Sequence, residues 1–343
     1  MNKRIVWGGG LLLLAAILLV AGVCAYRIWY DKKVPNFNAV MGLCVYPTMD
    51  KEQVEESILA ADIVRNPKSL KRVLRKVEDI KPGYYLIDST CSSTYVARMI
   101  QKGWQTPVNL TLAGSIRRPS DLARRIGNQM MVDSAAVASF ATSNDSLRAY
   151  GVDSTQLFTL IIPNTYQMLW TSSVREIFDR LVKEKDAWWT PERLEAARLQ
   201  RLTPQEVSTL ASVVSGETLY EQEQPSVAAV YLNRLNCGMR LQADPTIAFC
   251  FDYKLNRILF SHLLVESPYN TYKYAGLPPG PISCPPITCL EAVLHPDKNN
   301  YLYFCADPSF NGTHRFATTY SEHLVNARAF QKALTERQKS SAR

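Results

Sequence analysis

One apolar run near the start of the chain stands apart from all the others by its length. Residues 5–26 contain no charged residue, and this length matches the roughly 20 residues that span a bilayer. Aromatic residues lie at both ends of the run, as in the aromatic belts of membrane helices: Trp7, Tyr26, Trp29 and Tyr30. Cleaved signal segments have a shorter apolar core and a small-residue cleavage site. The pattern therefore predicts one uncleaved membrane-spanning helix.

Basic residues flank this run on both sides, two before it and three soon after it. The rule that positive charge stays in the cytoplasm therefore barely decides the orientation of the helix. We expect residues 1–4 to form a short cytoplasmic tail and residues 27–37 to form a connector into the first folded region.

Shorter runs in residues 38–112 predict a small α/β module in the order strand, helix, helix, strand, helix. The strands are expected to begin near Val45 and to cover Gly83–Ile87, and the helices are expected at Lys51–Ala61, Ser69–Val77 and Thr94–Gln101. Residues 65–76 carry six basic and no acidic residues. This segment is either a solvated helix face or a contact to anionic lipid head groups or an acidic polymer.

The pattern continues through residues 113–201 with further short elements. We expect strands at Val108–Leu112 and Leu157–Ile162, and helices at Ser120–Met130 and Ser173–Lys185. A second basic cluster lies at Arg117, Arg118, Arg124 and Arg125. Residues 187–202 are interpreted as the approach to a second domain.

The stretch from Thr203 to Thr218 predicts a helix that ends at a carboxylate. Thr203 is a good N-cap, and a proline and Glu206 follow at the spacing of a capping box. Glu217 continues the apolar stripe of this helix. Burial would raise the pKa of its carboxyl and suit it to general acid catalysis. The alternative is that the helix frays near Gly216 and Glu217 points to water.

A second helix is expected at Pro225–Leu235, followed by polar residues and then by a rigid loop. We expect an extended chain before Pro245, and Asp244 is either a ligand-binding residue or the N-cap of a turn. Prolines and glycines in residues 276–282 exclude a helix interior or a central strand. Amides and carboxylates so close in sequence suit a carbohydrate ligand.

Composition limits the remaining function classes. The 343 residues are 47% hydrophobic and 20% charged, which is typical of a globular protein with two or three structural units. The net charge of +8 suits an anionic surface or polymer. We find no nucleic-acid-binding signature, no zinc-protease, penicillin-binding or serine-hydrolase motif, and no phosphate-binding loop. We therefore expect no metal, no cofactor and no nucleic-acid partner.

Motifs over residues 202–330 together resemble the endolytic murein transglycosylases of the MltG (YceG-like) family. They occur in the family's order: ASVVSGET, VAAVYLNRL, MRLQADPT, SPYNTY, GLPPGPI, the HP at His295, YLYF with Ala306-Asp307, and the HRF at His314. Weaker matches precede them, namely KPGYYLI and PNTY. Two departures from the family pattern are Ser215-Gly216 before the glutamate and Asn164 in PNTY.

The resemblance implies an α+β protein of bacterial origin with a single inner-membrane helix. It implies a LysM-like membrane-proximal module at residues 38–112, a first part of the catalytic region at 113–201, a YceG-like catalytic core at 202–335 and a polar tail at 336–343. The chain after about Trp29 would then lie outside the cytoplasm and face the periplasm.

The resemblance also implies a lytic transglycosylase, a carbon–oxygen lyase of class EC 4.2.2.-. Such an enzyme cleaves the MurNAc–GlcNAc β-1,4 bond within peptidoglycan strands, leaves 1,6-anhydroMurNAc ends and terminates or trims nascent strands. Its partners would be glycan strands, the membrane and peptidoglycan synthases. The family's catalytic glutamate falls on Glu217. The candidates for substrate binding or charge stabilisation are Thr218, Glu223, Asn233, Gln242, Asp244, Asn270, Tyr272 and His314, the last of which is equally well explained as a structural histidine.

One carboxyl is sufficient for this chemistry, whereas ordinary glycosidases need two. The C6 hydroxyl of the sugar attacks its own anomeric carbon, so a single glutamic acid can serve as acid and then as base. The alternatives are an inactive membrane-tethered peptidoglycan-binding scaffold and an ordinary hydrolytic muramidase.

Seven cysteines lie outside the apolar run, and some should pair in an oxidising compartment. Close spacing predicts a disulfide between Cys284 and Cys289, with Cys237 and Cys250 as a second candidate pair. Buried free thiols are the alternative.

Overall fold

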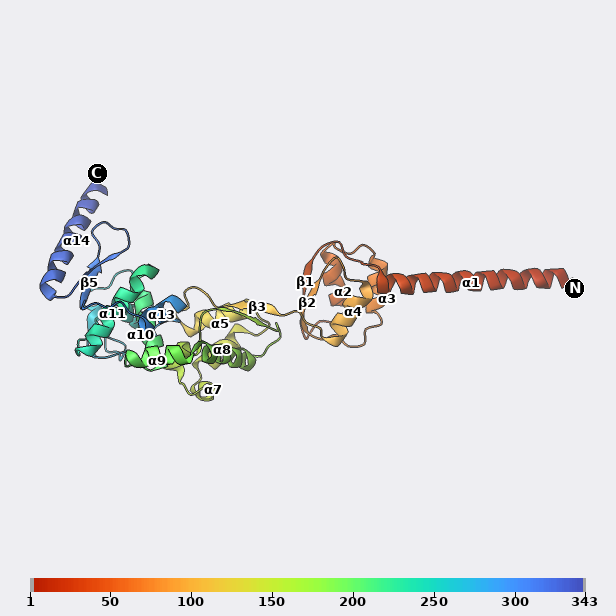
Figure 1. Cartoon of the computed structure of the whole chain (residues 1–343). Helices are drawn as coiled ribbons and strands as arrows, with labels where there is room; N and C mark the ends of the chain where they lie inside the picture. Colours follow the sequence, from red (N-terminus) through yellow and green to blue (C-terminus); the bar gives the residue numbers. More distant parts are fainter. Residues whose placement is uncertain (1–2, 342–343) are drawn as a thin grey trace. The chain divides into compact units, whose positions relative to one another are not determined.

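The computed structural model describes residues 3–341, and the side chains of residues 12–339. The chain folds as two compact units (Figure 1). Unit 1 contains the chain up to Leu110 together with residues 129–131 and 167–172. Unit 2 contains the remaining residues from Thr111 onward. Each unit has its own hydrophobic core, and the mixture of helices with small sheets confirms the α+β fold class.

A long first helix, α1 (Lys3–Lys33), begins unit 1. Its segment Leu12–Lys33 is long and apolar enough to cross a membrane, and its apolar side chains are exposed. The connector expected from residue 27 is wrong in its first part, because the helix continues to Lys33 and its last turns pack on α3 and α4. Residues 1–2 of the expected cytoplasmic tail and the Trp7 side chain lie outside the described part of the chain.

The rest of unit 1 confirms the predicted order strand, helix, helix, strand, helix. Strands β1 (Met41–Val45) and β2 (Gly83–Ile87) pair antiparallel. Helices α2 (Lys51–Ala60), α3 (Pro67–Leu74) and α4 (Ser93–Lys102) pack beside them, each with a side-chain cap at its first turn. The core of unit 1 fills with aliphatic and aromatic side chains from all these elements, among them Val45, Ile58, Leu70, Tyr85 and Ile100.

Strand β3 (Val108–Thr111) pairs with β4 (Thr165–Met168), and three of the helices of unit 2 lie between these strands in the chain, while a fourth follows β4. Those helices are α5 (Pro119–Gly127), α6 (Ser134–Thr142), α7 (Asn144–Arg148) and α8 (Val174–Trp188). The strand expected at Leu157–Ile162 is wrong, because residues 154–160 form the 3₁₀ helix η1 (Ser154–Leu160), capped by Asp153. A short run that is buried on every side does not distinguish strand from helix by its pattern.

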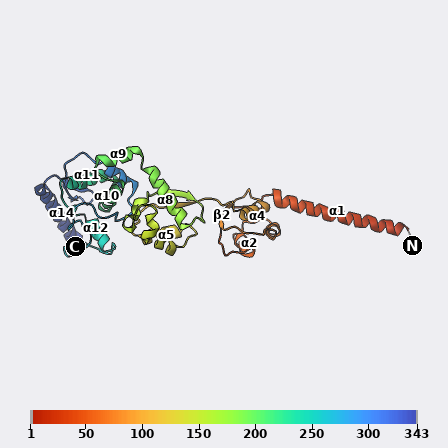
Figure 2. The same cartoon turned by 90° about the horizontal axis from the view of Figure 1, so that it is seen from below.

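The remainder of unit 2 is built around two central helices, α10 (Pro204–Glu217) and α11 (Gln224–Asn236), which pack on each other (Figure 2). Both also pack on α13 (Ile287–Leu294) (Figure 1). Helix α9 (Pro191–Leu199) forms where the sequence predicted only an approach to this domain. The other elements are η2 (Glu221–Glu223), α12 (Asp244–Cys250), η3 (His262–Leu264), β5 (Tyr303–Ala306), β6 (His314–Ala317) and α14 (Tyr320–Ser341). The expected polar tail is helical as far as Ser341.

The predicted disulfides are wrong in this structure, because all eight cysteines are free thiols and all lie in the described part of the chain. Cys284 and Cys289 are buried, and the Cys284 thiol donates a hydrogen bond to the carbonyl of Ile161. Burial raises the pKa of both thiols to about 12. The alternative of buried free thiols therefore describes these two residues.

Candidate active site

Glu217 is the last residue of α10, and the predicted capping box at the other end of the helix is confirmed by reciprocal bonds between Thr203 and Glu206. Gly216 lies against Pro245 of α12. A Cβ atom at Gly216 would come within 2.5 Å of the Pro245 Cβ, so no larger residue fits without a shift. Glycine at this position, where the resembled family differs, therefore allows α12 to approach the end of α10.

Helix α10 is regular as far as Glu217, and the carboxyl of this residue faces the protein and not water. The Tyr231 hydroxyl of α11 donates a hydrogen bond of 2.5 Å to its Oε1 atom. Removal of the carboxyl from water raises its pKa to about 7, and the nearby charge of Asp244 acts in the same direction. The Tyr231 hydrogen bond and the charge of Arg234 oppose this rise. Glu217 is therefore able to hold and release a proton near neutral pH.

The hydrogen bond of Tyr231 also determines which carboxyl oxygen carries the proton. Oε1 accepts from the Tyr231 hydroxyl, so a protonated Glu217 carries its proton on Oε2. The pKa of Tyr231 is raised well above its ordinary value, chiefly by burial and then by the Glu217 carboxylate, so Tyr231 keeps its own proton. Oε2 is thus the oxygen left to exchange a proton with a ligand.

Asp244 and Tyr272 form a second polar pair beside Glu217. The Tyr272 hydroxyl donates to Asp244 Oδ1 at 2.6 Å, and both residues interact electrostatically with Glu217. Asp244 is the first residue of α12 and not its N-cap. The extended residue is Ala243, while Gln242 before it has a left-handed φ of 50°, so the expectation of an extended chain at Asp244 is wrong.

A fixed positive charge lies behind these groups. Arg234 of α11 is 8% exposed, and its guanidinium donates at 2.7 Å to the carbonyl oxygens of both Leu241 and Leu302. These bonds to backbone hold the guanidinium in place without neutralising it. Its charge favours the ionised form of Glu217 and stabilises a carboxylate that has given up its proton.

Glu223 and His314 form a separate pair, and one aromatic ring links their region to Tyr231. Glu223 accepts from the His314 backbone N–H at 2.7 Å and contacts the His314 Nδ1 at 3.0 Å. The Phe304 ring lies edge-on to both Tyr231 and His314. These bonds give His314 a fixed partner, which is consistent both with a role in the site and with a structural histidine.

Three of the remaining candidates use their polar groups within the fold. Thr218 is buried, and its hydroxyl accepts from the Tyr220 backbone N–H. The amide nitrogen of Asn233 donates to the carbonyls of residues 299 and 301, and that of Asn270 donates to those of residues 263 and 265. Gln242 is exposed, and its backbone N–H bonds to Thr271. The structure thus gathers Glu217, Asp244 and Tyr272, and gives the other candidates hydrogen bonds elsewhere within the fold.

Sequence reasoning missed Tyr231, whose hydroxyl contacts the central carboxyl, and left Arg234 open between solvent and a site. Both lie on the inward face of α11, three positions apart, and both are largely buried. A tyrosine and an arginine on an otherwise apolar helical face are the signal that could have identified them, because buried polar groups need a partner.

A pocket of about 410 Å³ opens beside this group of residues. Its lining includes Ser215, Gly216 and Leu219, which bracket Glu217 along the chain, and Pro245, which follows Asp244. A larger pocket of about 780 Å³ lies between α9, α11 and the loop after α13, and Asn233 is its only lining residue among the predicted site residues. Glu217 itself is in the lining of neither pocket, but its chain neighbours Ser215 and Gly216 line the smaller one, so we place the candidate chemistry next to the smaller pocket. The described residues contain no group of three or more His, Cys, Asp or Glu side chains placed to hold a metal ion.

Comparisons with known proteins show the family of the chain. A family model described as the YceG-like family matches residues 43–329. An endolytic murein transglycosylase of Bacillus subtilis (strain 168) is 35% identical over 152 residues, which cover 44% of this chain and 41% of that protein. One from Streptococcus pneumoniae serotype 2 (strain D39) is 24% identical over 352 residues, covering 92% of this chain and 63% of that protein.

A solved structure shows the same fold. The crystal structure of a YceG-like protein from Listeria monocytogenes superimposes with a TM-score of 0.55 at 24% identity, covering 83% of this chain and 97% of that chain. The present chain spans between 41% and 63% of the length of the curated relatives that it matches.

Proposed function

Because this chain belongs to the YceG-like family, we propose that it is a membrane-anchored lytic transglycosylase that cleaves peptidoglycan within its glycan strands. The observation that carries the proposal is Glu217, a carboxyl with a pKa of about 7 beside a pocket and with one oxygen committed to Tyr231. The matched relatives from two bacteria are named endolytic murein transglycosylases, which supports the same substrate class.

In the proposed reaction, Glu217 acts first as a general acid. The proton on Oε2 passes to the glycosidic oxygen that joins MurNAc C1 to GlcNAc C4, and the C1–O bond breaks. The GlcNAc end leaves as an alcohol, and positive charge develops at C1 of the MurNAc ring. A pKa near the working pH serves this step, because the acid must be protonated and yet transfer its proton readily.

Glu217 then acts as a base on the same sugar. The C6 hydroxyl of MurNAc attacks C1, the C1–O6 bond forms, and the hydroxyl proton returns to Glu217. No water is consumed, one C–O bond breaks and one forms, and the enzyme recovers its starting protonation state. Tyr231 and Arg234 stabilise the carboxylate between the two steps, since one donates a hydrogen bond to it and the other supplies positive charge.

Asp244 has the properties of a charge-stabilising group in this reaction. It is exposed, it interacts electrostatically with Glu217, and the Tyr272 hydroxyl holds its Oδ1 atom. A carboxylate placed there would stabilise the positive charge that develops on the sugar ring. Asp244 also raises the pKa of Glu217, which keeps the acid protonated for the first step.

The proposal includes the membrane. We propose that α1 is a single-pass inner-membrane anchor and that both units face the periplasm, where the substrate is found. The exposed apolar side chains of Leu12–Lys33 support this placement. Synthases that extend glycan strands at the same membrane surface are the proposed partners. A cytoplasmic reporter that is active when fused after Asn36 would contradict this orientation.

The decisive experiment is analysis of the products. Purified sacculi are digested with the detergent-solubilised full-length protein, and the fragments are examined by mass spectrometry. We expect 1,6-anhydroMurNAc ends within long fragments, as an endolytic transglycosylase would produce. Reducing ends would indicate an ordinary muramidase, and binding to sacculi without cleavage would indicate a scaffold.

A further inference from the structure

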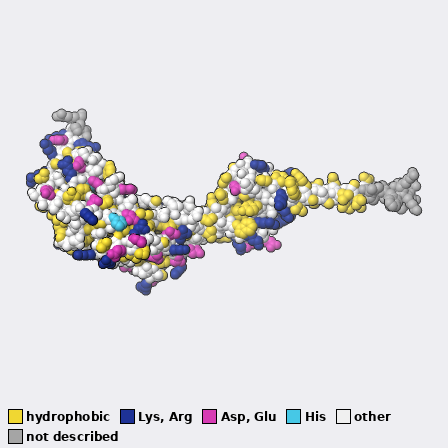
Figure 3. Space-filling view, viewed as in Figure 1, with side chains coloured by type: hydrophobic (Ala, Val, Ile, Leu, Met, Phe, Trp, Pro, Cys, Tyr) yellow, Lys and Arg dark blue, Asp and Glu magenta, His cyan; other side chains and the backbone are white. Residues whose placement is uncertain are grey.

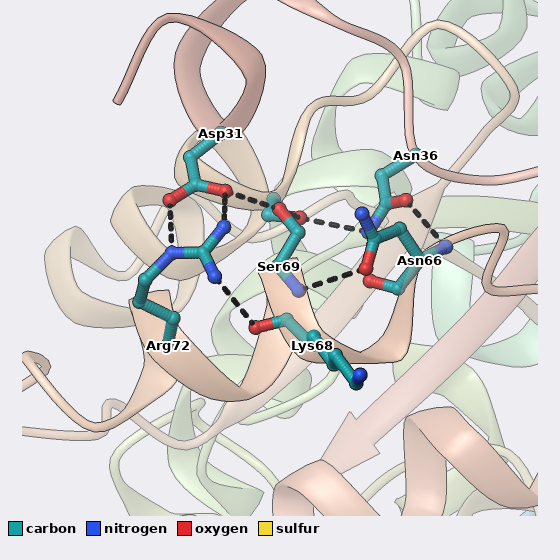
Figure 4. A network of polar contacts seen from close by, with 7 residues as sticks. Asp31, Asn36, Asn66, Lys68, Ser69 and Arg72 are labelled. Atoms are coloured by element: carbon teal, nitrogen blue, oxygen red, sulfur yellow. Dashed lines mark hydrogen bonds and ion pairs between the residues drawn. The ribbon is translucent and has the colours of Figure 1, made fainter. Parts of the chain in front are cut away.

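The end of α1 is fixed to the rest of unit 1 by an ion pair between a buried carboxylate and a partly exposed guanidinium. Asp31 is 6% exposed, and its two carboxylate oxygens accept from the Arg72 guanidinium of α3 at 2.8 and 2.6 Å (Figure 4). The Ser69 hydroxyl donates to the same carboxylate at 2.5 Å. A bidentate pair with a third donor gives one fixed geometry, so α3 is held in a set position against the last turns of α1.

A second group of bonds extends this attachment into the module. Asn36 is fully buried, and its amide donates to the Asn66 carbonyl and to the Ser93 hydroxyl, while its oxygen accepts from the Asn66 N–H. Ser69 and Ser93 share a hydrogen bond at 2.9 Å. The anchor helix, α3 and the start of α4 are therefore joined by one polar network (Figure 4).

The aromatic residues of α1 indicate where the membrane surface meets this network. Tyr26 and Trp29 are 61% and 55% exposed, as residues of an interfacial belt would be. Trp29 precedes Asp31 by two residues, or about 3 Å along the helix axis. If the belt lies at head-group level, the Asp31–Arg72 pair and the face of α3 beside it lie at that level too.

Helix α3 carries an unusual positive charge at that position. Six basic and no acidic residues occupy 65–76, and Lys68, Arg75 and Lys76 are exposed. Lys68 and Arg75 form no salt bridge within the described residues. Lys32 and Lys33 end α1 nearby, and Figure 3 shows Lys and Arg side chains gathered where the apolar helix leaves unit 1. Arg72 and Lys71 pair with Asp31 and Glu55, whereas the charges of Lys68 and Arg75, beside the aromatic belt, have no acidic partner within the described residues.

We propose that the basic side of α3 binds anionic phospholipid head groups of the bilayer that α1 crosses. The Asp31–Arg72 pair supplies the fixed geometry, and Lys68, Arg75 and Lys76 supply the charge. Each basic residue near an anionic surface strengthens such an association about five-fold. The inference rests on the proposed membrane anchor, and it assigns the module a second, electrostatic attachment.

The test uses the full-length protein in lipid nanodiscs and an amine-labelling reagent. One set of discs contains phosphatidylglycerol mixed with phosphatidylcholine, and the other contains phosphatidylcholine alone. We expect Lys68 and Lys76 to be labelled several-fold more slowly in the anionic discs, and high salt to remove the difference. Lys81 and Lys102 are the internal controls, because Lys102 lies at the far end of α4 from Ser93, about 15 Å along the helix, and Lys81 bonds to the backbone at that end.

A variant separates head-group binding from simple burial by the disc. Arg75→Gln removes an exposed charge outside the Asp31 network and should reduce the protection of Lys68 and Lys76 in anionic discs about five-fold. Equal labelling of Lys68 and Lys76 in the two kinds of disc would overturn the proposal while leaving the anchor intact. Protein that fails to enter either disc would contradict the anchor itself.

Discussion

Each unit encloses a carboxylate, Asp31 in unit 1 and Glu217 in unit 2. The two differ in whether a positively charged side chain contacts the carboxylate directly. Asp31 accepts two hydrogen bonds from Arg72 and one from Ser69, so its charge is matched at the point of contact. Glu217 accepts a hydrogen bond from one neutral hydroxyl, and another carboxylate lies nearby. A carboxylate that is paired with a guanidinium stays ionised and holds the two helices in one geometry. A carboxyl without such a partner can gain and lose a proton near neutral pH. The comparison explains why Asp31 can fix α3 to α1 and why Glu217 has the properties of the proposed acid.

The largest expected effect comes from removing the titrating group of Glu217, which tests whether this carboxyl transfers the proton. Glu217→Gln keeps the size of the side chain but cannot deliver or accept a proton, so turnover of sacculi should fall by about 10²–10⁴-fold or more. Fold and peptidoglycan binding should be preserved, which circular dichroism and co-sedimentation with sacculi would check. Asp244→Asn is the companion variant and should lose less, because it changes only charge stabilisation. A near-normal rate for Glu217→Gln would assign the chemistry to another group.

The paired carboxylate should instead affect stability. Asp31→Ala removes the partner of the Arg72 guanidinium, and because the Arg72 side chain is 31% exposed we expect a cost of about 1.5–3 kcal/mol, below that of a fully buried pair. We expect this loss in native-state hydrogen exchange of α3 and α4, with little change in α10 or α11. Asp79→Ala is the matched control, because its pair with Lys81 is exposed and is worth about 1 kcal/mol at most. Equal effects of the two variants would show that the buried pair is not special.

The unmatched carboxylate should also make stability depend on pH. The folded protein binds the Glu217 proton more tightly than the unfolded chain does, since its pKa is about 7 in the fold and 4.5 ordinarily. This stabilisation is fully present below pH 4.5 and is lost as the pH rises through 7. Glu217→Gln lacks the effect, so from pH 4 to pH 8 it should gain up to about 3 kcal/mol relative to the parent. Unfolding of both proteins at the two pH values measures the difference, and a constant difference would contradict it.

The smallest of these effects concerns the hydrogen bond that Glu217 does have. Tyr231→Phe removes a donor that favours the carboxylate, so the pKa of Glu217 should rise further. The alkaline limb of the pH–rate profile should move upward, and the rate at its optimum should fall about ten-fold because the carboxylate formed between the two steps loses a partner. Tyr220→Phe is the control, since its hydroxyl bonds to the Asn311 carbonyl and not to Glu217. An unchanged profile would remove Tyr231 from the mechanism.

Local patterns predicted the elements that carry these residues. The capping box at Thr203, the apolar stripe through Val214 and the uncharged run of residues 5–26 depend only on neighbours in the chain, and each forms a helix in the structure. The module of unit 1 was likewise predicted in its order of elements. The run at residues 157–162 failed because an apolar segment buried on all sides has no polar face to reveal its period.

Tertiary structure decided what each charged group does. The sequence offered two environments for Glu217, and only the packing of α11 and α12 against the end of α10 removes its carboxyl from water and brings Tyr231 to Oε1. Asp31 was counted in a connector, and it became a buried partner of Arg72 because α1 continues beyond the apolar run. Helical periodicity is a property of neighbouring residues, whereas a pKa depends on charges and solvent brought close by distant ones. The sequence therefore singled out Glu217 as the candidate acid, and the fold determines the proton affinity of its carboxyl.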